Sequence, residues 1–322
     1  MNKRKIGDLE VSAVGLGCMG FSHAYGVATE KNEAIRTIRD AYEYGYNFFD
    51  TAECYMGQNA DGSTSYNEEL VGEAVKPIRD KVIIATKFGV KNMGDHLEMD
   101  SSPETIRKSV DGSLKHLGID TIDLYYQHRI DPKIEPETVA EVMAELIKEG
   151  KIRHWGISET DEDYLRRADA VCHVTAIENR YSMLARWHES LFPVCEDLDI
   201  GYVAFSPLGN GFLTGKYQSG SSFTEGDFRS FMPQYTAEGL EAAKSLLDLL
   251  SGMSKEKDVT MGQLSLAWMM NKKPFIVPIP RSRKAERLKE NAGAADISLI
   301  DEEIKKIDTL LDTISIPVFG GH

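Results

Sequence analysis

The stretch Phe48-Phe49-Asp50-Thr51-Ala52-Glu53-Cys54-Tyr55 joins a short apolar run to a carboxylate and then to a phenol. Two later runs end in a similar way. Val82-Ile83-Ile84-Ala85-Thr86-Lys87 ends in a lysine, and Ile122-Asp123-Leu124-Tyr125-Tyr126-Gln127-His128 ends in a histidine. Short apolar runs rich in β-branched and aromatic residues are typical of buried strands. Three successive predicted strands therefore lead directly into ionisable side chains.

The rest of the chain continues this alternation of short apolar runs with amphipathic stretches. Helical stripes separate the runs, one formed by Ile106, Val110, Leu114 and Leu117 and another by Val139, Val142, Met143, Leu146 and Ile147. Eight strands are predicted: Val14–Gly17, Asn47–Asp50, Val82–Thr86, Ile122–Gln127, His154–Ser158, Thr175–Glu178, Tyr202–Phe205 and Phe275–Val277. Strands that alternate with helices favour a parallel sheet, whose commonest closed form is the (β/α)8 barrel. Such a barrel can hold all 322 residues in a single domain, residues 1–322.

Three segments add to the barrel pattern. Arg4 to Val11 is predicted to form a hairpin with Gly7-Asp8 at its turn, covering the barrel floor. Residues 207 to about 236, after the seventh strand, form a connection long enough to bind or cover a ligand. Asp301 to Asp312 is predicted to be an extra C-terminal helix.

Composition narrows the class of protein. Apolar residues make up 42% and charged residues 27% of the chain, as in an ordinary soluble globular protein. No apolar run approaches the roughly 20 residues that span a bilayer. The four cysteines are scattered, which favours reduced thiols in a cytoplasm. Cys54, beside Tyr55, could be reactive, but we interpret it as a spectator. The net charge of −14 argues against nucleic acid or an anionic membrane as a partner.

Four side chains are expected to meet at one end of the barrel, because the carboxyl ends of its strands converge there: Asp50, Tyr55, Lys87 and His128. An ammonium group beside a phenol should lower the phenol's pKa and make it a better proton donor. A carboxylate would hold the ammonium in place, and a neutral imidazole could donate to a carbonyl oxygen. Each residue alone could instead be a helix cap, an ion pair or a packed side chain. Their joint occurrence favours acid catalysis on a carbonyl group.

A basic segment, Arg281 to Lys289, carries five cations and one anion. On so acidic a chain it is a candidate anion site, although a solvated helix face has the same composition. No His-x-His or His-x-x-x-His pattern occurs, so we predict no metal site and discount an unrelated metal-dependent barrel enzyme.

These motifs, taken in order, resemble those of the aldo-keto reductases, in particular the bacterial, fungal and plant branch of that family. The resemblance covers essentially the whole chain and rests on Gly15-Leu16-Gly17-Cys18-Met19-Gly20, Asp50-Thr51-Ala52-Glu53-Cys54-Tyr55, Thr86-Lys87-Phe88-Gly89, Tyr125-Tyr126-Gln127-His128-Arg129, Gly156-Ile157-Ser158-Glu159, Ser206-Pro207-Leu208-Gly209-Asn210-Gly211 and Glu290-Asn291. It implies an NADPH-dependent oxidoreductase that reduces small-molecule aldehydes or ketones. Tyr55 would be the general acid, Lys87 and Asp50 would tune it, and His128 would orient the substrate carbonyl.

The resemblance also implies a set of residues that bind NADP(H). Ser158, Glu159 and Glu178 would lie at the nicotinamide carboxamide, and Phe205 would stack on the nicotinamide ring. The pyrophosphate would lie against the backbone of Ser206, Leu208 and Gly209, with Lys216 nearby. The adenosine 2′-phosphate would contact Arg281, Ser282 and Arg287, and the adenine would contact Glu290 and Asn291.

Several positions depart from the family pattern. Glu178 stands where most relatives have glutamine, Arg180 where they have glutamate, Phe205 where tyrosine is common, and Arg281 where glycine is common. The loop residues Phe21, Tyr25, Met56 and Trp187 could line the mouth and favour an apolar aldehyde, or could simply pack. An alternative function is that of a redox-sensing NADP(H)-binding regulatory protein resembling the potassium-channel β-subunits.

Overall fold

The computed structural model describes residues 1–24, 26–93, 96–217, 223 and 227–320, and its centre is a parallel sheet of eight strands. In sequence these are β3 (Leu16–Gly17), β4 (Phe48–Asp50), β7 (Ile83–Phe88), β10 (Ile122–Gln127), β11 (Ile152–Ser158), β12 (Ala176–Arg180), β13 (Gly201–Phe205) and β14 (Ile276–Pro278). Neighbouring strands are consecutive in this order. The Gly15 amide donates to the Pro278 carbonyl at 2.9 Å, which links the two edges. The predicted (β/α)8 barrel is confirmed.

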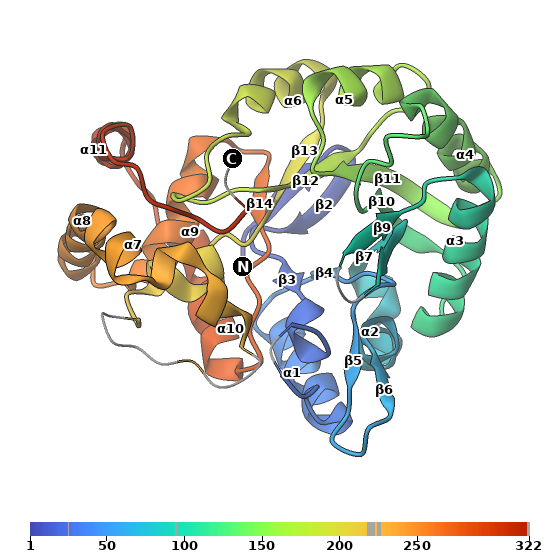
Figure 1. Cartoon of the computed structure of the whole chain (residues 1–322), viewed down its shortest axis with the longest axis horizontal. Helices are drawn as coiled ribbons and strands as arrows, with labels where there is room; N and C mark the ends of the chain where they lie inside the picture. The colour runs from blue at the N-terminus through green and yellow to red at the C-terminus, as the bar shows by residue number, and fades with distance from the viewer. Residues whose placement is uncertain (25, 94–95, 218–222, 224–226, 321–322) are drawn as a thin grey trace.

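All eight predicted strands occur, with ends that differ from the prediction by no more than two residues. The helices are α1 (Lys31–Glu43), α2 (Asn67–Val75), α3 (Pro103–Leu117), α4 (Pro136–Lys148), α5 (Glu162–Asp169), α6 (Phe192–Leu198), α7 (Ala237–Ala242), α8 (Lys244–Glu256), α9 (Met261–Lys272), α10 (Ala285–Gly293) and α11 (Asp301–Leu311). Figure 1 shows α3 to α6 as an arc outside the strands, with α8 and α11 on the outer side of α9. The extra terminal helix is therefore confirmed as α11.

In the described part of the chain, three hairpins accompany the sheet. Strands β1 (Lys3–Ile6) and β2 (Leu9–Ser12) form the predicted N-terminal hairpin, whose Ile6, Leu9 and Val11 join the apolar cluster inside the barrel. Two further hairpins follow β4 and β7: β5 (Met56–Gln58) with β6 (Thr64–Tyr66), and β8 (Val90–Asn92) with β9 (Leu97–Met99). The long connection after β13 contains the short 3-10 turns η4 (Gly209–Thr214), η5 (Phe228–Phe231) and η6 (Pro233–Tyr235).

The helices cover the outer face of the sheet with apolar side chains. On α3, Ile106, Val110 and Leu117 are buried as the periodicity predicts, whereas Leu114 is only partly buried. The helix begins where the sequence indicates, because the Ser102 side chain accepts from the Thr105 amide and Pro103 follows it. Burying one such large apolar side chain stabilises the fold by about 1.5–3 kcal/mol.

The barrel interior determines which side chains reach its open end. Successive residues of a strand point to opposite faces, so residues two apart share a face. Phe48, Ala85, Tyr126, Ala176 and Val203 all belong to the interior cluster. Two residues further along the chain are Asp50, Lys87, His128, Glu178 and Phe205. The same alternation that fills the interior therefore directs these five side chains inward at the carboxyl ends of the strands.

Candidate functional site

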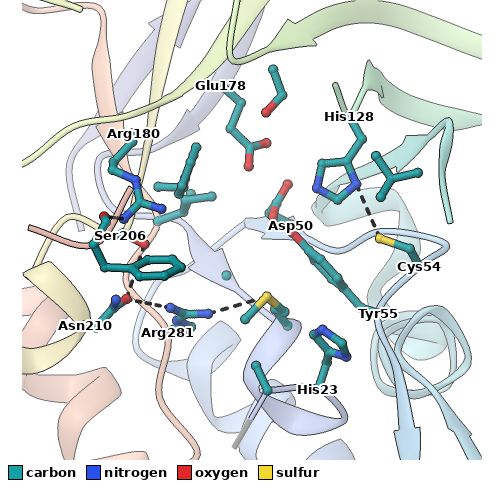
Figure 2. Close-up of a pocket in the computed structure, with 18 of the residues that line it drawn as sticks. His23, Asp50, Cys54, Tyr55, His128, Glu178, Arg180, Ser206, Asn210 and Arg281 are labelled. Atoms are coloured by element: carbon teal, nitrogen blue, oxygen red, sulfur yellow. Dashed lines mark hydrogen bonds between the residues drawn. The ribbon is translucent and has the colours of Figure 1, made fainter. Parts of the chain in front are cut away.

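A cavity of about 650 Å³ opens at the carboxyl ends of the strands, a volume within the range of small-molecule sites. Asp50, Tyr55, His128 and Glu178 lie on its wall (Figure 2). Ser158 and Phe205 line the same cavity. Gly156 lies on β11 beside Tyr126, and a Cβ there would approach the Tyr126 ring to 2.4 Å. Glycine at this position thus leaves room for the large ring beneath the cavity.

Lys87 lies behind this wall and is completely buried. Its Nζ donates to both carboxylate oxygens of Asp50, at 2.6 and 2.7 Å, and to the Thr51 carbonyl oxygen at 2.8 Å. The Glu178 carboxyl oxygen Oε1 lies 3.4 Å from the same nitrogen. Because β4 and β7 are neighbours in the sheet, the backbone itself holds this ion pair together.

Two carboxyl groups thus surround one ammonium group. Burial acts to lower the pKa of Lys87, but the charges of Asp50 and Glu178 outweigh it and the pKa of Lys87 is raised. Burial raises the pKa of Glu178 well above its usual value, and the Asp50 charge raises it further. One ammonium cannot fully balance two buried carboxylates, so Glu178 holds a proton more tightly than an ordinary carboxyl group does. Its Oε2 is buried and has no hydrogen-bond partner among the described residues.

Tyr55 lies on the loop after β4, which several hydrogen bonds hold in place. The Ser22 hydroxyl and the Asn67 amide both donate to the Tyr55 carbonyl oxygen. The Tyr55 ring meets the His128 ring edge-on at 5.6 Å between centroids, and the Lys87 Nζ lies 5.2 Å from the Tyr55 ring centroid. Asp50, Lys87, Tyr55 and His128 are therefore brought together as expected.

The expected direction of the Tyr55 pKa shift is wrong. Burial raises the pKa of Tyr55, Lys87 acts to lower it, and Asp50 and Glu178 raise it further, so the net change is upward. The physical reason is that the charge of Lys87 is already balanced by a carboxylate, while a phenolate at this depth would lose its hydration. The hydroxyl of Tyr55 consequently keeps its proton at neutral pH.

His128 follows β10, is 7% exposed, and donates its backbone amide to the Phe88 carbonyl oxygen. Burial lowers the pKa of His128 well below its usual value, and the nearby charges of Arg129 and Lys87 lower it further. The imidazole is therefore neutral at physiological pH and can donate one hydrogen bond. This agrees with the neutral donor expected from the sequence.

Some of the predicted cofactor residues lie on the cavity wall. Ser158, Glu178, Phe205, Ser206 and Arg281 all line it. The Arg129 guanidinium donates to the Ser158 hydroxyl at 3.0 Å. The guanidiniums of Arg129 and Arg180 lie 5.8 and 5.2 Å from the centroid of the Phe205 ring. Figure 2 shows Arg281 reaching Asn210, to which it donates at 2.8 Å.

The other predicted cofactor residues lie outside this lining. Glu159 follows Ser158 and accepts the Arg180 backbone amide. Leu208, Gly209 and Lys216 belong to the connection after β13. Ser282, Arg287, Glu290 and Asn291 follow β14, the last three on α10, where the Arg287 guanidinium donates to the Glu290 carboxylate. A ligand that contacts both the cavity-lining residues and the residues after β14 must therefore extend from the cavity toward α10.

Backbone strain concentrates around the cavity. Among the described residues, six non-glycine residues have positive φ angles. Asp199 and Asp258 are not in the cavity lining, and the other four are Ala24, Glu159, Ser206 and Asn210, at 68°, 56°, 52° and 61°. Three of them line the cavity, and Glu159 follows the lining residue Ser158. A non-glycine residue in the left-handed region costs about 1–2 kcal/mol. Strain of this kind is common at functional sites, and the residue types alone do not reveal it.

Several lining residues were not foreseen. His23, Phe231, Met232 and Phe319 all face the cavity. Phe319 lies far from the strand ends in sequence, and no periodicity links it to them. Of the two interpretations of Phe21, at the mouth or packed, the structure supports the second, because Phe21 is 1% exposed in the core. Met56 and Trp187 are absent from the described lining, and Tyr25 lies outside the described residues.

In the described part of the chain, no helix is both long and apolar enough to cross a membrane. Within the same residues, no group of three or more His, Cys, Asp or Glu side chains is arranged to hold a metal ion.

Comparison with known proteins gives consistent matches over the whole chain. A family model described as the aldo/keto reductase family matches residues 13–312. The curated protein named probable aldo-keto reductase 1 from Glycine max is 37% identical over 301 residues, which cover 92% of this chain and 85% of the relative. An aldo-keto reductase from Strobilurus tenacellus is 35% identical over 325 residues, which cover 98% of this chain and 93% of the relative.

Solved structures of similar chains share the fold. A glycerol dehydrogenase from Gluconobacter oxydans has a TM-score of 0.85 at 26% identity, covering 99% of this chain and 98% of its own. An aldo-keto reductase from Klebsiella pneumoniae, solved in complex with NADPH, has a TM-score of 0.72 at 26% identity. The match covers 100% of this chain and 98% of that structure's chain.

Proposed function

The chain belongs to the aldo/keto reductase family, and from that premise we propose that it is an NADPH-dependent reductase of small-molecule aldehydes and ketones. The observation that carries the proposal is the meeting of Asp50, Tyr55 and His128 at one wall of the cavity, with Lys87 directly behind it. We infer that residues 1–322 form one domain. We also infer a cytoplasmic location, because all four cysteines are free thiols and a reducing compartment keeps thiols free.

The cavity fits a nicotinamide cofactor. Phe205 offers an aromatic face, and the Glu178 Oε2, which has no partner among the described residues, can accept from a carboxamide nitrogen. Ser158 adds a hydroxyl, and Arg281 adds a cation for phosphate groups. We assign Ser206, Leu208, Gly209 and Lys216 to the pyrophosphate, and Ser282, Arg287, Glu290 and Asn291 to the adenosine end. When bound, the reduced cofactor supplies hydride to the substrate carbonyl carbon.

The chain's own residues would supply the proton. The Tyr55 hydroxyl and the His128 imidazole are two neutral donors that can converge on one carbonyl oxygen. Together they polarise the carbonyl and orient it. As the oxygen becomes basic, the proton of Tyr55 moves to it, and the Lys87 ammonium, 5.2 Å from the ring, stabilises the phenolate left behind. Asp50 keeps Lys87 charged and fixed.

The surroundings of the cavity favour a substrate with an apolar body. Val90, Leu97, Phe231, Met232 and Phe319 all line it. Phe231 is 80% exposed and Leu97 is 51% exposed, so each offers apolar surface to a ligand. We therefore propose an aromatic or bulky apolar aldehyde, whose burial against these side chains would contribute about 25 cal/mol per Å².

The test is the loss of near-ultraviolet absorbance of reduced cofactor with purified protein and a panel of aldehydes. NADPH should be oxidised faster than NADH, and 4-nitrobenzaldehyde should be reduced more efficiently than the small, polar methylglyoxal. Equal rates with both cofactors would overturn the assignment of the 2′-phosphate contacts. Tight NADPH binding without turnover of any aldehyde would overturn the reductase proposal and favour the redox-sensing alternative.

A further inference from the structure

Cys54 lies within the site and contacts His128 directly. Its Sγ is 3.4 Å from the Nδ1 atom of the His128 ring, a contact drawn as a dashed line in Figure 2. The thiol also lines the cavity beside Tyr55. We propose that Cys54 is a positioning residue: its S–H donates to Nδ1 of His128 and thereby fixes the imidazole in the tautomer that carries its proton on Nε2. This inference rests on the proposed carbonyl reductase function.

The contact is held by rigid backbone on both sides. The Glu53 amide donates to the Lys87 carbonyl oxygen, and the Met56 amide donates to the Cys54 carbonyl oxygen. On the other side, the His128 amide is bonded to the Phe88 carbonyl oxygen and Arg129 donates to the His128 carbonyl oxygen. The thiol and the ring are therefore brought together by the same β-strand ends that form the rest of the site.

The chemistry of the two groups sets the direction of the hydrogen bond. Burial raises the pKa of the Cys54 thiol to about 12, so the sulfur carries a hydrogen at neutral pH. A ring nitrogen with a free lone pair is a strong acceptor, whereas thiol sulfur is a weak one. The stronger hydrogen bond is therefore the one in which the Cys54 S–H donates to Nδ1 of His128. A neutral imidazole ring then has its only N–H at Nε2.

The other ring nitrogen is the one available to a ligand. His128 is 7% exposed and lines the cavity, and no hydrogen bond among the described residues involves its Nε2. A carbonyl oxygen can only accept, so it needs Nε2 to carry the hydrogen. In the opposite tautomer, with the proton on Nδ1, the lone pair of Nε2 would face a lone pair of the carbonyl oxygen. Tyr55 would then be the only hydrogen-bond donor to that oxygen.

The first test is spectroscopic and independent of turnover. Two-bond ¹H–¹⁵N correlation spectra of the protein labelled with ¹⁵N-histidine distinguish the two tautomers, and a His128→Gln sample assigns the signal. The wild-type protein should show His128 with its proton on Nε2. In Cys54→Ala, the same signal should shift toward a mixture of tautomers, and in Cys54→Ser it should return to the wild-type position. A wild-type spectrum with the proton on Nδ1 would overturn the proposal.

The second test is kinetic and uses matched variants. Cys54→Ala should lower kcat/KM for 4-nitrobenzaldehyde by about three- to tenfold, the range that one neutral hydrogen bond contributes. Cys54→Ser keeps a donor and should recover most of that loss. Cys172→Ala, a half-buried cysteine near the start of β12, is the control and should match the wild type. Equal losses in Cys54→Ala and Cys54→Ser would mean that the thiol only fills space. Inactivity of the wild type toward every aldehyde would refute the reductase function but leave the tautomer assignment to the spectra.

Discussion

At the residue scale, Glu178 sets the charge balance of the site. It is 3% exposed, its Oε1 lies 3.4 Å from the Lys87 ammonium, and Asp50 has already taken that ammonium in two hydrogen bonds. A buried carboxyl beside another carboxylate holds its proton more tightly than an exposed one, and the pKa of Glu178 is raised for both reasons. Where the resemblance implies glutamine, Glu178 therefore offers a carboxyl group that holds its proton more tightly than an ordinary one.

Replacement of Glu178 by glutamine should reveal this proton. The folded pKa of Glu178 is raised above the ordinary value of 4.5, so the folded state holds a proton that the unfolded state releases. Wild-type stability should therefore fall, relative to Glu178→Gln, as pH rises from 4.5 toward the folded pKa, and the difference between the two should become constant below pH 4.5. Thermal melts across this pH range test whether the stability of the wild type falls relative to that of Glu178→Gln. Glu141→Gln, on the exposed face of α4, is the control. Parallel curves for the wild type and Glu178→Gln would mean that Glu178 is charged throughout.

At the element scale, the spacing of helices around the barrel depends on close backbone approaches. Helices α2 and α3 pack side by side, and Gly72 of α2 faces the last residue of α3, Leu117. A Cβ at Gly72 would lie 2.2 Å from the Leu117 carbonyl oxygen. Gly112 of α3 has no atom within 4 Å of the corresponding position. One glycine permits packing, whereas the other only weakens its helix.

The same substitution at these two glycines should have opposite effects. Gly72→Ala forces the two helices apart and should destabilise the protein by about 1–3 kcal/mol. Gly112→Ala removes a flexible residue from a helix interior and should stabilise it by about 0.5–1 kcal/mol. Shifts of the thermal unfolding midpoint in opposite directions are expected. A melting temperature of Gly72→Ala equal to that of the wild type would show that α2 can move away without cost.

At the scale of the whole molecule, the alternation of strands with helices was sufficient to predict the barrel and the meeting of Asp50, Lys87 and His128. That prediction works because a parallel strand fixes both the face and the end at which its side chains lie. The presence of Phe319 in the cavity lining could not be predicted, because it depends on the path of the chain after α11. The pKa of Tyr55 was predicted in the wrong direction because burial depth is a property of the assembled barrel.

The long connection after β13 shows the same limit. Its length indicated a binding role, and Phe231 and Met232 within it do line the cavity. Its composition did not identify those two residues, because their position depends on the turns η5 and η6 and on the Tyr235 hydroxyl, which donates to the Asn210 carbonyl oxygen. Tertiary contacts of this kind link segments that share no sequence pattern.

The central claim, that Tyr55 delivers the proton in an NADPH-dependent carbonyl reduction, is tested most directly by one comparison. Turnover of saturating 4-nitrobenzaldehyde by the wild type and by Tyr55→Phe would be measured together with the Kd of NADPH from protein fluorescence. Loss of one general acid should lower kcat by about 10²- to 10⁴-fold. The Kd of NADPH should stay unchanged, because the ring remains and only the hydroxyl is lost. A Tyr55→Phe variant that turns over as fast as the wild type would contradict the account.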